Sequence, residues 1–371
     1  MQIAVVASME AGIEKAYAIN SVNMAQGFAK LGHDVTLITF AKRDRKYTLD
    51  ELIEQYDIRV PLRWIQLPRV FRKRFISPDL PFASMALLHL WRLRPNFVFS
   101  RSYIAPILSA RYGFPTVVES HAHTDNRTPP FLKMIDAITH DPQLRYLITI
   151  SDVLSQHYQS LDVPQDKILV LPTGVDMDRF NRPDNLPPTP YTTDKPNVVY
   201  VGHLYDYKGI PTILETAKVC QDIQFHLIGG LPQDIERVRA IITDQNLLNV
   251  TLHGHKPQSD IPPYLWNADI LLLPPSLNHP SARWTSPVKL GEYLASGTPV
   301  IATRIPALQD WLTDEQVTFI EPDSSSAMAL ALKSVLSNPL DAKQKSVQGI
   351  QRAYEFSYRM RAETILKKCG F

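Results

Sequence analysis

Two lysines, a glutamate and two glycines stand where buried strands of the predicted fold would end. Gly202 closes the apolar run VVYVG and is followed by Lys208 and Gly209, whereas Lys289 and Glu292 come after the run ADILLLP. A diphosphate group is bound by backbone N–H groups that can approach closely and by fixed positive charges. The pattern therefore predicts a diphosphate site formed by Gly202, Lys208, Gly209 and the segment that carries Lys289.

That segment, WTSPVKLGEYLASGTPV, has the start and stop signals of a helix. Ser286 suits the N-cap, Pro287 the first helical position, and Gly297 the left-handed stop. On such a helix Lys289 and Glu292 share one surface, close to the exposed N–H groups at the positive end of the helix dipole. A helix end of this kind binds anions.

Composition excludes several classes of protein. The length of 371 residues favours two domains, and a net charge of +2 is too balanced for a nucleic-acid-binding surface. The only cysteines, Cys220 and Cys369, lack metal-ligand spacing and fit a reducing compartment. No run approaches the roughly 20 apolar residues of a membrane span, and no signal peptide precedes the first strand. We therefore expect a cytoplasmic protein that binds no nucleic acid and no metal.

Short β-branched runs alternate with helix-compatible segments along both halves of the chain. The runs are IAVVAS, VTLITF, FVFSR, TVVESH, YLITIS and ILVLP, then VVYVG, FHLIGG, VTLHGH, ADILLLP, PVIAT and VTFIEP. Such alternation is typical of parallel sheets with helices on both faces. A proline-rich polar stretch over 181–196 predicts a linker. We expect an α/β protein with two doubly wound domains, 1–180 and 197–354, that face each other across a ligand-binding cleft.

Several segments together resemble a known family. They are GHDVTLIT, VVESHAHT, LITISD, VLPTGVDMDRF, YVGHLYDYKGIPTILETA, HLIGG, ADILLLPPS and TSPVKLGEYLASGTPVIAT. Their order and spacing, over nearly the whole chain, resemble the retaining glycosyltransferases with the GT-B fold, the large family-four group that includes bacterial mannosyl- and glucosyltransferases. The resemblance implies two Rossmann-like domains, the first on the acceptor side and the second binding the nucleotide sugar. It also implies that the final helix, 355–371, crosses back to pack on the first domain.

The resemblance gives roles to individual residues. Lys208 would contact the donor diphosphate, Glu292 would hold the ribose hydroxyls, and His121 would lie against the transferred sugar. The resemblance and the strand ends together add further donor-binding candidates, namely Gly12, Gly202, His255, Lys256, Trp284, Ser286, Pro287, Val288 and Lys289.

Three positions depart from the family pattern. His203 stands where the family usually has an arginine, so this charge on the diphosphate becomes conditional on pH. Trp284 stands where the family commonly places a first glutamate, and its ring suits packing or sugar stacking. After the first strand, the glycine-rich loop is reduced to Gly12. The candidate catalytic residues are His121, Lys208 and His203.

We expect a retaining glycosyltransferase that moves a sugar from a nucleoside-diphosphate sugar to a hydroxyl of a glycan, lipid or small molecule. Preorganised donors can stabilise a leaving diphosphate without a divalent ion, so no metal or cofactor is expected. The resemblance favours front-face attack, with the leaving phosphate oxygen accepting the acceptor's proton. Two alternatives stay open. One is a nucleotide-sugar epimerase of the same fold, which needs acid and base groups around the sugar, and the other is a degenerate protein that only binds a nucleotide or a partner.

One basic segment, RVFRKRFISP, has its own interpretation. It interleaves Arg69, Arg72, Lys73 and Arg74 with apolar residues. It is either a solvated loop or a patch that meets anionic lipid head groups, at about 1 kcal/mol per basic residue. The second interpretation predicts peripheral association with the inner face of a membrane.

Overall fold

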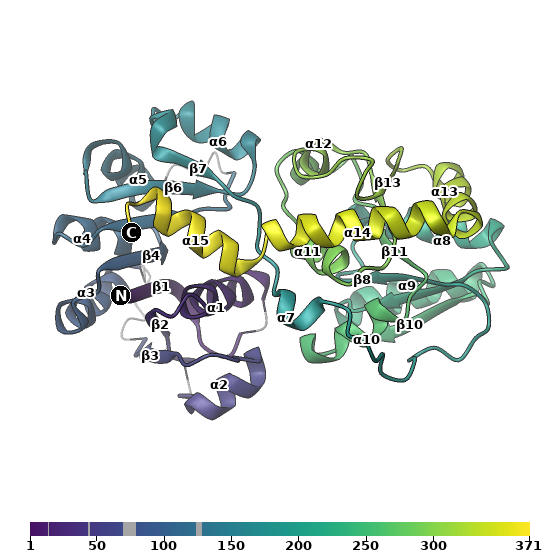
Figure 1. The fold of residues 1–371 in the computed structure, drawn as a ribbon, viewed down its shortest axis with the longest axis horizontal. Helices are drawn as coiled ribbons and strands as arrows, with labels where there is room; N and C mark the ends of the chain where they lie inside the picture. Colours follow the sequence, from purple (N-terminus) through teal and green to yellow (C-terminus); the bar gives the residue numbers. More distant parts are fainter. Residues whose placement is uncertain (14, 44, 70–78, 124–127) are drawn as a thin grey trace. The chain divides into compact units, whose positions relative to one another are not determined.

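The computed structural model describes residues 1–371 except 14, 44, 70–78 and 124–127 (Figure 1). The described chain forms two compact units. The first comprises Met1–Gly174 and Phe356–Phe371, and the second comprises Val175–Glu355. Each unit has its own parallel sheet and its own buried core.

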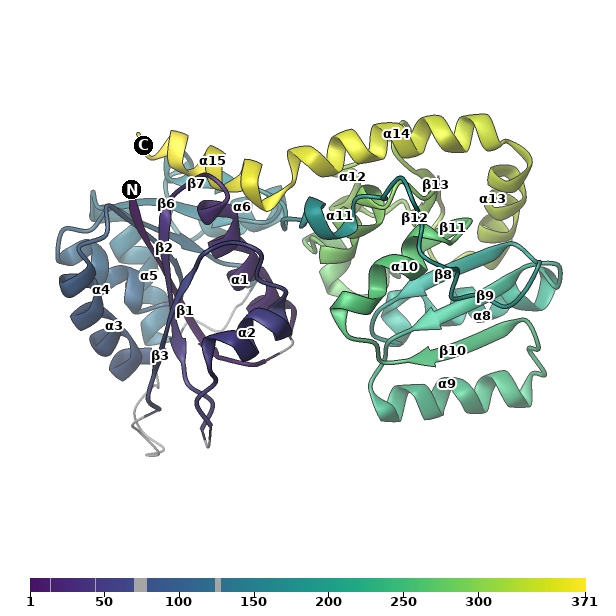
Figure 2. The same cartoon turned by 60° about the horizontal axis from the view of Figure 1, so that its bottom comes forward.

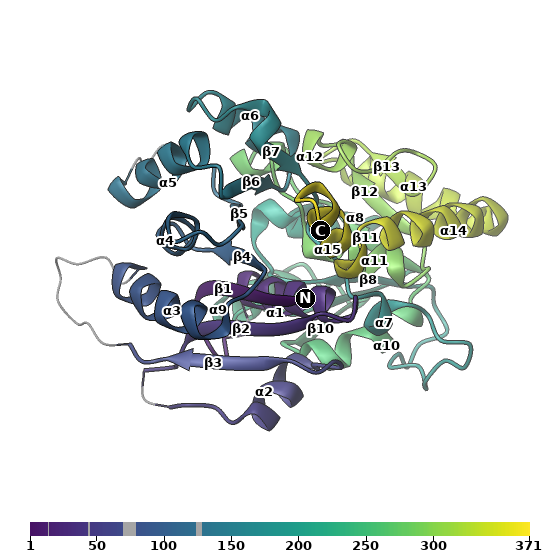
Figure 3. The same cartoon turned by 60° about the vertical axis from the view of Figure 1, so that its left-hand side comes forward.

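The first unit is built on a seven-stranded parallel sheet with the order β3-β2-β1-β4-β5-β6-β7, which can be followed in Figure 3. Its strands are β1 (Gln2–Glu10), β2 (Asp34–Phe40), β3 (Arg63–Leu67), β4 (Phe97–Arg101), β5 (Thr116–Glu119), β6 (Leu144–Thr149) and β7 (Ile168–Val170). The order reverses between β1 and β4. Doubly wound sheets bind ligands beyond the carboxyl ends of their strands at such a reversal.

Helices cover both faces of this sheet, which is why its central strands are apolar on both sides. They are α1 (Ala16–Ala29), α2 (Leu49–Tyr56), α3 (Asp79–Leu93), α4 (Ala105–Arg111), α5 (Pro129–His140), α6 (Asp152–Gln159) and α15 (Tyr358–Lys368). Successive residues of β1 point to opposite faces. Ile3 lies in the core that contains Phe28 of α1, whereas Ala4 lies in the core that contains Phe82 of α3.

The helix α15, labelled in Figure 2, completes the core of the first unit. Tyr358 at its start packs directly on two glycines. A Cβ at Gly27 would lie 2.4 Å from the Tyr358 carbonyl oxygen, and one at Gly174 would lie 2.5 Å from the Tyr358 ring. Ile365 and Leu366 are buried in the same core. The first unit therefore depends on residues that follow the second unit in the chain.

The second unit is built on a six-stranded parallel sheet with the order β10-β9-β8-β11-β12-β13. Its strands are β8 (Asn197–Val201), β9 (Gln224–Ile228), β10 (Val250–Gly254), β11 (Ile270–Leu273), β12 (Val300–Thr303) and β13 (Thr318–Ile320). The order reverses between β8 and β11. The expectation of two doubly wound α/β domains is confirmed.

Short and long helices precede, connect and follow the strands of the second unit. The α-helices are α7 (Met177–Phe180), α8 (Ile210–Val219), α9 (Pro232–Asp244), α10 (Ile261–Trp266), α11 (Val288–Ala295), α12 (Pro306–Gln309), α13 (Ser325–Ser337) and α14 (Pro339–Glu355). Three tight helical turns precede helices, namely η2 (Asp206–Lys208), η3 (Gln258–Asp260) and η4 (Pro280–Arg283). Figure 2 shows α9 beside β10 at one edge of this sheet.

The stretch 181–196, expected as a linker between domains, belongs to the second unit and packs on it. Tyr191 is buried, its ring lies 4.3 Å from the ring of His226, and its hydroxyl donates a 2.6 Å hydrogen bond to the carbonyl of Tyr264. The expected boundary at residue 180 also lies too late, because Val175 already belongs to the second unit. Proline-rich composition predicts irregular backbone, but it does not predict whether an aromatic residue within that stretch is buried.

Among the described residues, none of the helices combines the length and the apolar character that crossing a bilayer requires.

Candidate functional site

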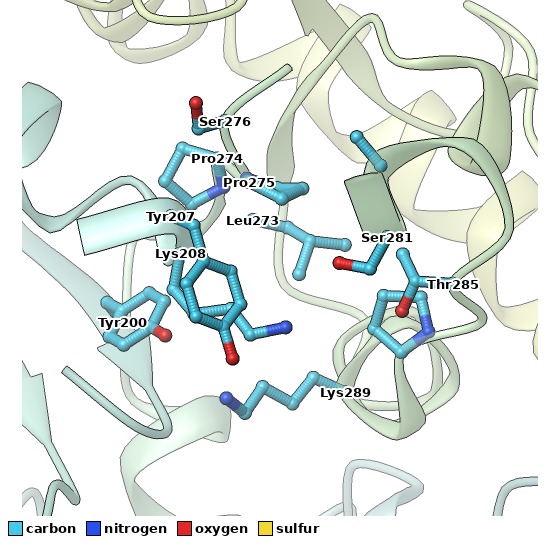
Figure 4. Close-up of a pocket in the computed structure, with 12 residues that line it drawn as sticks. Tyr200, Tyr207, Lys208, Leu273, Pro274, Pro275, Ser276, Ser281, Thr285 and Lys289 are labelled. Atoms are coloured by element: carbon cyan, nitrogen blue, oxygen red, sulfur yellow. The ribbon is translucent and has the colours of Figure 1, made fainter. Parts of the chain in front are cut away.

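A pocket in the second unit opens where the strand order reverses, between β8 and β11 (Figure 4). Its walls come from β8, η2, the segment after β11, η4 and the start of α11. The lining residues are Tyr200, Tyr207, Lys208, Leu273, Pro274, Pro275, Ser276, Ser281, Ala282, Thr285, Pro287 and Lys289. Because such reversals are where doubly wound sheets bind ligands, this pocket is the candidate site.

Lys289 reaches from the first turn of α11 to the end of β8. A Cβ at Gly202 would lie 1.4 Å from Nζ of Lys289, so only a glycine leaves room for this ammonium group. Gly202 also has a φ of +145°, which side chains with a Cβ rarely adopt. The Nζ atom lies 5.1 Å from the centre of the Tyr200 ring. Gly202, which the sequence predicts to approach a phosphate, therefore also leaves space for the amino group of Lys289.

Lys208 enters the same pocket from η2, and Figure 4 shows both lysine side chains extending into it. Its Nζ lies 5.0 Å from the centre of the Tyr207 ring. Gly209 directly after it is in tight contact, because a Cβ there would lie 1.9 Å from the carbonyl oxygen of Pro274. Burial lowers the pKa of Lys208. The turn thus holds a lysine at the strand ends, as the sequence predicts.

Glu292 lies on α11, three residues after Lys289, and only 7% of it is exposed. Its Oε1 accepts a 3.1 Å hydrogen bond from Nε2 of Gln258. Burial raises the pKa of Glu292, and the charges of Lys289 and Arg179 with the Gln258 hydrogen bond oppose that rise. The carboxylate is therefore held among cationic and donor groups. Gln258 and Arg179 were not among the predicted site residues.

The start of α11 differs from the prediction. The helix begins at Val288 and its N-cap is Pro287, with a φ of −65° and a ψ of 127°, so Ser286 is not the cap. Ser286 is buried one residue further from the helix. The end of the helix is as predicted, because Gly297 follows the C-cap with a φ of +67°. The first N–H groups of α11 still face the end that carries Pro287 and Lys289.

His203 begins a row of stacked rings that local sequence reasoning missed. Its ring lies 5.0 Å from that of Tyr205, Tyr205 lies 5.4 Å from Tyr207, and Tyr207 lies 4.0 Å from His279. Partial burial lowers the pKa of His203, as do the charges of Lys289, Lys208 and His255, against the opposing charge of Asp234. A neutral ring at neutral pH follows. The alternating aromatic residues of YDY were the only sequence signal for this row.

The remaining predicted residues of the second unit are not among those that line the pocket. His255 is exposed after β10, and the pKa of His253 is lowered by burial and by the charge of Lys256. Trp284 ends η4, where its backbone N–H donates to the carbonyl of Ser281 at 3.2 Å. Val288 is the first residue of α11.

His121 follows β5 in the first unit and joins a cluster of charged groups. Its Nε2 lies 2.7 Å from Oε1 of Glu119, whose side chain is fully buried. Arg361 of α15 pairs with Oε2 of this carboxylate at 2.7 Å, and Arg101 of β4 lies 3.6 Å from Oε1. Although burial opposes ionisation, the positive groups around Glu119, Arg361 first, hold its pKa well below its usual range. Burial and Arg101 lower the pKa of His121 to about 4, against the attraction of Glu119.

Gly12, the other candidate in the first unit, is held by the segment around α2. A Cβ at Gly12 would lie 2.3 Å from the ring of Tyr47, and its carbonyl accepts a 2.9 Å hydrogen bond from Nε2 of Gln55. The loop after β1 is therefore packed against Tyr47.

Of the basic segment, Arg69 pairs with Glu10, whereas Arg72, Lys73 and Arg74 lie outside the described residues. Among the residues that the structure describes, no group of three or more His, Cys, Asp or Glu side chains is arranged to hold a metal ion.

Comparison with known proteins identifies the family. Residues 195–338 match the glycosyl transferases group 1, and residues 21–179 match glycosyltransferase family 4. The putative colanic acid biosynthesis glycosyltransferase WcaL of Escherichia coli K12 is 28% identical over 204 residues, covering 53% of this chain and 48% of that protein. The match thus spans about half of the length of this relative. The WcaL of Salmonella typhimurium is 24% identical over 352 residues, covering 84% of this chain and 85% of that protein.

Solved structures show the same fold. A glycosyltransferase from Rickettsia africae has a TM-score of 0.75 at 19% identity, covering 99% of this chain and 98% of that chain. HepE of Anabaena in complex with UDP has a TM-score of 0.71 at 13% identity, covering 100% of both chains. The chain belongs to the family-4 glycosyltransferases with the GT-B fold. The resemblance to family-four glycosyltransferases with the GT-B fold is confirmed.

Proposed function

We propose that the protein is a retaining, metal-independent glycosyltransferase that moves a sugar from a nucleoside-diphosphate sugar to an acceptor hydroxyl. The observation that carries this proposal is the convergence of Lys208, Lys289 and Glu292 where the strand order of the second sheet reverses. Two cations suit a diphosphate, and a carboxylate that accepts hydrogen bonds suits ribose hydroxyls. The complex of HepE with UDP, a protein of the same fold, supports a nucleotide donor.

The charge that develops on the leaving diphosphate is the main problem of this reaction. Lys208 and the N-terminal N–H groups of α11 are fixed before the donor arrives, so they stabilise that charge without reorganisation. None of the described residues that line the pocket carries a carboxylate able to act as a nucleophile. This supports front-face attack, in which the leaving phosphate oxygen accepts the acceptor's proton. His121 is proposed to contact the transferred sugar.

We propose that the acceptor is a hydroxyl of a growing glycan. The support is the family relationship to proteins named for colanic acid biosynthesis.

The decisive experiment incubates the purified protein with UDP, GDP and ADP sugars, with and without glycan acceptors, and measures nucleoside diphosphate release and the products. Release that depends on an acceptor, with a product of retained anomeric configuration, supports the proposal. An isomerised nucleotide sugar would identify an epimerase instead. Binding without any turnover would identify a protein that only binds nucleotide.

We also propose peripheral contact with an anionic membrane through the first unit. Leu80, Leu88 and Trp91 of α3 are exposed large apolar residues, and Trp91 lies 5.1 Å from the exposed ring of Tyr112. Arg92, on the same helix, is also exposed. Sedimentation with phosphatidylglycerol vesicles should fall for the Trp91→Ser variant, and equal sedimentation of parent and variant would reject this contact.

A further inference from the structure

The first feature is the position of the Lys289 amino group beside Gly202. The amino group stands against the backbone of Gly202, in the space that any other side chain at residue 202 would fill. The lysine side chain also lies by the ring of Tyr200, at the end of β8. The amino group of Lys289 therefore lies at the strand reversal, in space that the glycine at position 202 leaves open.

The second feature is the charge environment of the two pocket lysines. Within the described part of the chain, neither Lys208 nor Lys289 forms an ion pair with a carboxylate. Glu292 attracts Lys289 electrostatically without forming an ion pair with it, and its Oε1 accepts a hydrogen bond from Gln258. Two half-buried ammonium groups in one pocket, neither of them in an ion pair with a described carboxylate, are costly by themselves. The two positive charges become favourable when an anion enters the pocket.

The groups around Lys289 set its protonation. Lys208 and His203 face it from the segment after β8, Tyr200 from β8 itself, and Glu292 from its own helix. Burial and the charge of Lys208 lower the pKa of Lys289 to about 7, against the attraction of Glu292. A large fraction of Lys289 is thus neutral in the empty site at neutral pH.

We propose that Lys289 is the second cation on the donor diphosphate, in the role that the family resemblance gives to an arginine at position 203, and that the site takes up a proton there when the donor binds. This inference rests on the proposed function, because a nucleoside diphosphate must occupy the pocket. His203 is stacked on Tyr205 and carries a lowered pKa, so it supplies this charge poorly. The proton comes from solvent and no covalent bond to the protein is formed.

A lysine that can lose its proton lets the charge of the pocket differ between the empty and the occupied site. In the empty pocket one lysine can lose its proton, which relieves repulsion between the two ammonium groups. When the diphosphate enters, its negative charge favours the protonated form again. The pocket is then doubly positive only while the anion is present. Release of the nucleoside diphosphate returns the proton.

Calorimetric titration with UDP at pH 8, in two buffers that differ in ionisation enthalpy, measures the affinity and the protons taken up in one experiment; GDP and ADP replace UDP if it does not bind. The phosphates are fully ionised at this pH, because their second pKa lies near 6. We expect uptake on the order of one proton for the parent, since a lysine with a pKa of about 7 is mostly neutral at pH 8.

Three variants separate the charge from its titration. Lys289→Met should lower the affinity by about tenfold to a hundredfold, as expected for loss of a charged hydrogen bond, and should abolish proton uptake. Lys289→Arg keeps the charge at every pH, so it should retain more affinity than Lys289→Met while uptake disappears. Lys218→Met, which removes an exposed lysine paired with Glu215 on α8, should behave as the parent.

The outcomes that would overturn the inference are distinct from failure of the proposed function. Parent-like UDP affinity in Lys289→Met would remove Lys289 from the diphosphate site and leave the transferase proposal standing. Loss of proton uptake in His203→Gln, with uptake kept in Lys289→Met, would assign the titration to His203. Absence of binding for UDP, GDP and ADP in the parent would remove the proposed function itself. A thermal unfolding midpoint equal to that of the parent shows that each variant is folded.

Discussion

Nε2 of His121 and Oε1 of Glu119 lie 2.7 Å apart, and the Glu119 carboxylate can only accept hydrogen bonds. Nε2 therefore carries the hydrogen, and Nδ1 is left as an acceptor in the neutral ring. Since the pKa of His121 is lowered to about 4, this neutral form prevails at neutral pH. His121 is thus a poor general acid. It is suited to accept a hydrogen bond from a sugar hydroxyl.

The first prediction concerns the ion pair that anchors Glu119. Arg361→Met should lower the free energy of unfolding of the first unit by about 3–5 kcal/mol, because it leaves a buried carboxylate without its closest cation. Urea denaturation measures the change. Arg45→Met, which removes an exposed partner of Glu51, should cost at most about 1 kcal/mol. Equal effects of the two substitutions would show that the Arg361 pair contributes little.

The second prediction is a loss of stability in acid. His226 lies 2.9 Å from both His253 and the side-chain oxygen of Asn197, and burial with His253 lowers its pKa to about 4. Between pH 6.5 and 4 the unfolded chain binds a proton that the folded chain does not. The free energy of unfolding should therefore fall as the pH drops through this window, by on the order of 3 kcal/mol for this residue.

Denaturation with urea from pH 8 to pH 4 tests this pH dependence. His226→Gln should have a smaller acid loss than the parent, whereas His140→Gln, which replaces a side chain that is 73% exposed, should match the parent. His121 should add a similar loss in the first unit, because its pKa is also about 4. If the free energy of unfolding of His226→Gln depended on pH as it does in the parent, His226 would not be the source of the acid loss.

The third prediction concerns Glu292. Glu292→Gln should weaken nucleotide binding by about tenfold or more, since charged hydrogen bonds contribute roughly 1.5–3 kcal/mol and an amide accepts more weakly. The thermal unfolding midpoint should not fall, because burial already penalises the charge. Fluorescence titration with a nucleoside diphosphate measures the affinity. Parent-like affinity would mean that Glu292 does not hold the ribose.

The fourth prediction separates ground-state binding from catalysis at Lys208. Lys208→Met should reduce kcat more than it raises KM for the donor, because the diphosphate gains charge as the glycosidic bond breaks. Steady-state kinetics at saturating acceptor measure both constants. A rise in KM with an unchanged kcat would assign Lys208 to uniform binding of the donor.

The fifth prediction is that chelation leaves the rate unchanged. Lys208 and Lys289 are proposed to supply positive charge to the diphosphate, so EDTA should not alter kcat or the donor KM. Rates are compared before and after dialysis against the chelator. Strong inhibition that magnesium or manganese reverses would contradict a metal-independent reaction.

Sequence reasoning predicted which residues of the candidate site lie together because ligands of parallel sheets bind beyond the carboxyl ends of the strands. Residues that follow parallel strands gather at one edge of the sheet, which placed Gly202, Lys208 and Lys289 together before any contact was known. The same reasoning misplaced Ser286. A residue before proline is kept in extended backbone, and here Pro287 is extended as well, so the helix begins one position later.

Other features had no local signal. The contact between Lys289 and Gly202 depends on how α11 packs against β8, and the pair of Arg361 with Glu119 joins the last helix to the fifth strand. Such contacts between distant segments follow from tertiary packing, which periodicity and turn signals do not encode. Tyr191 shows the same limit, because its stretch looked like a linker and yet is packed on the sheet.

The chain order of the first unit has a consequence for synthesis. Tyr358, Ile365 and Leu366 belong to its core, but the ribosome makes them only after the whole of Val175–Glu355. The second unit can therefore complete its core while the core of the first unit still lacks α15. Domains usually fold in the order in which they emerge, the N-terminal one first. In this chain the part that is translated first is the part that finishes folding last.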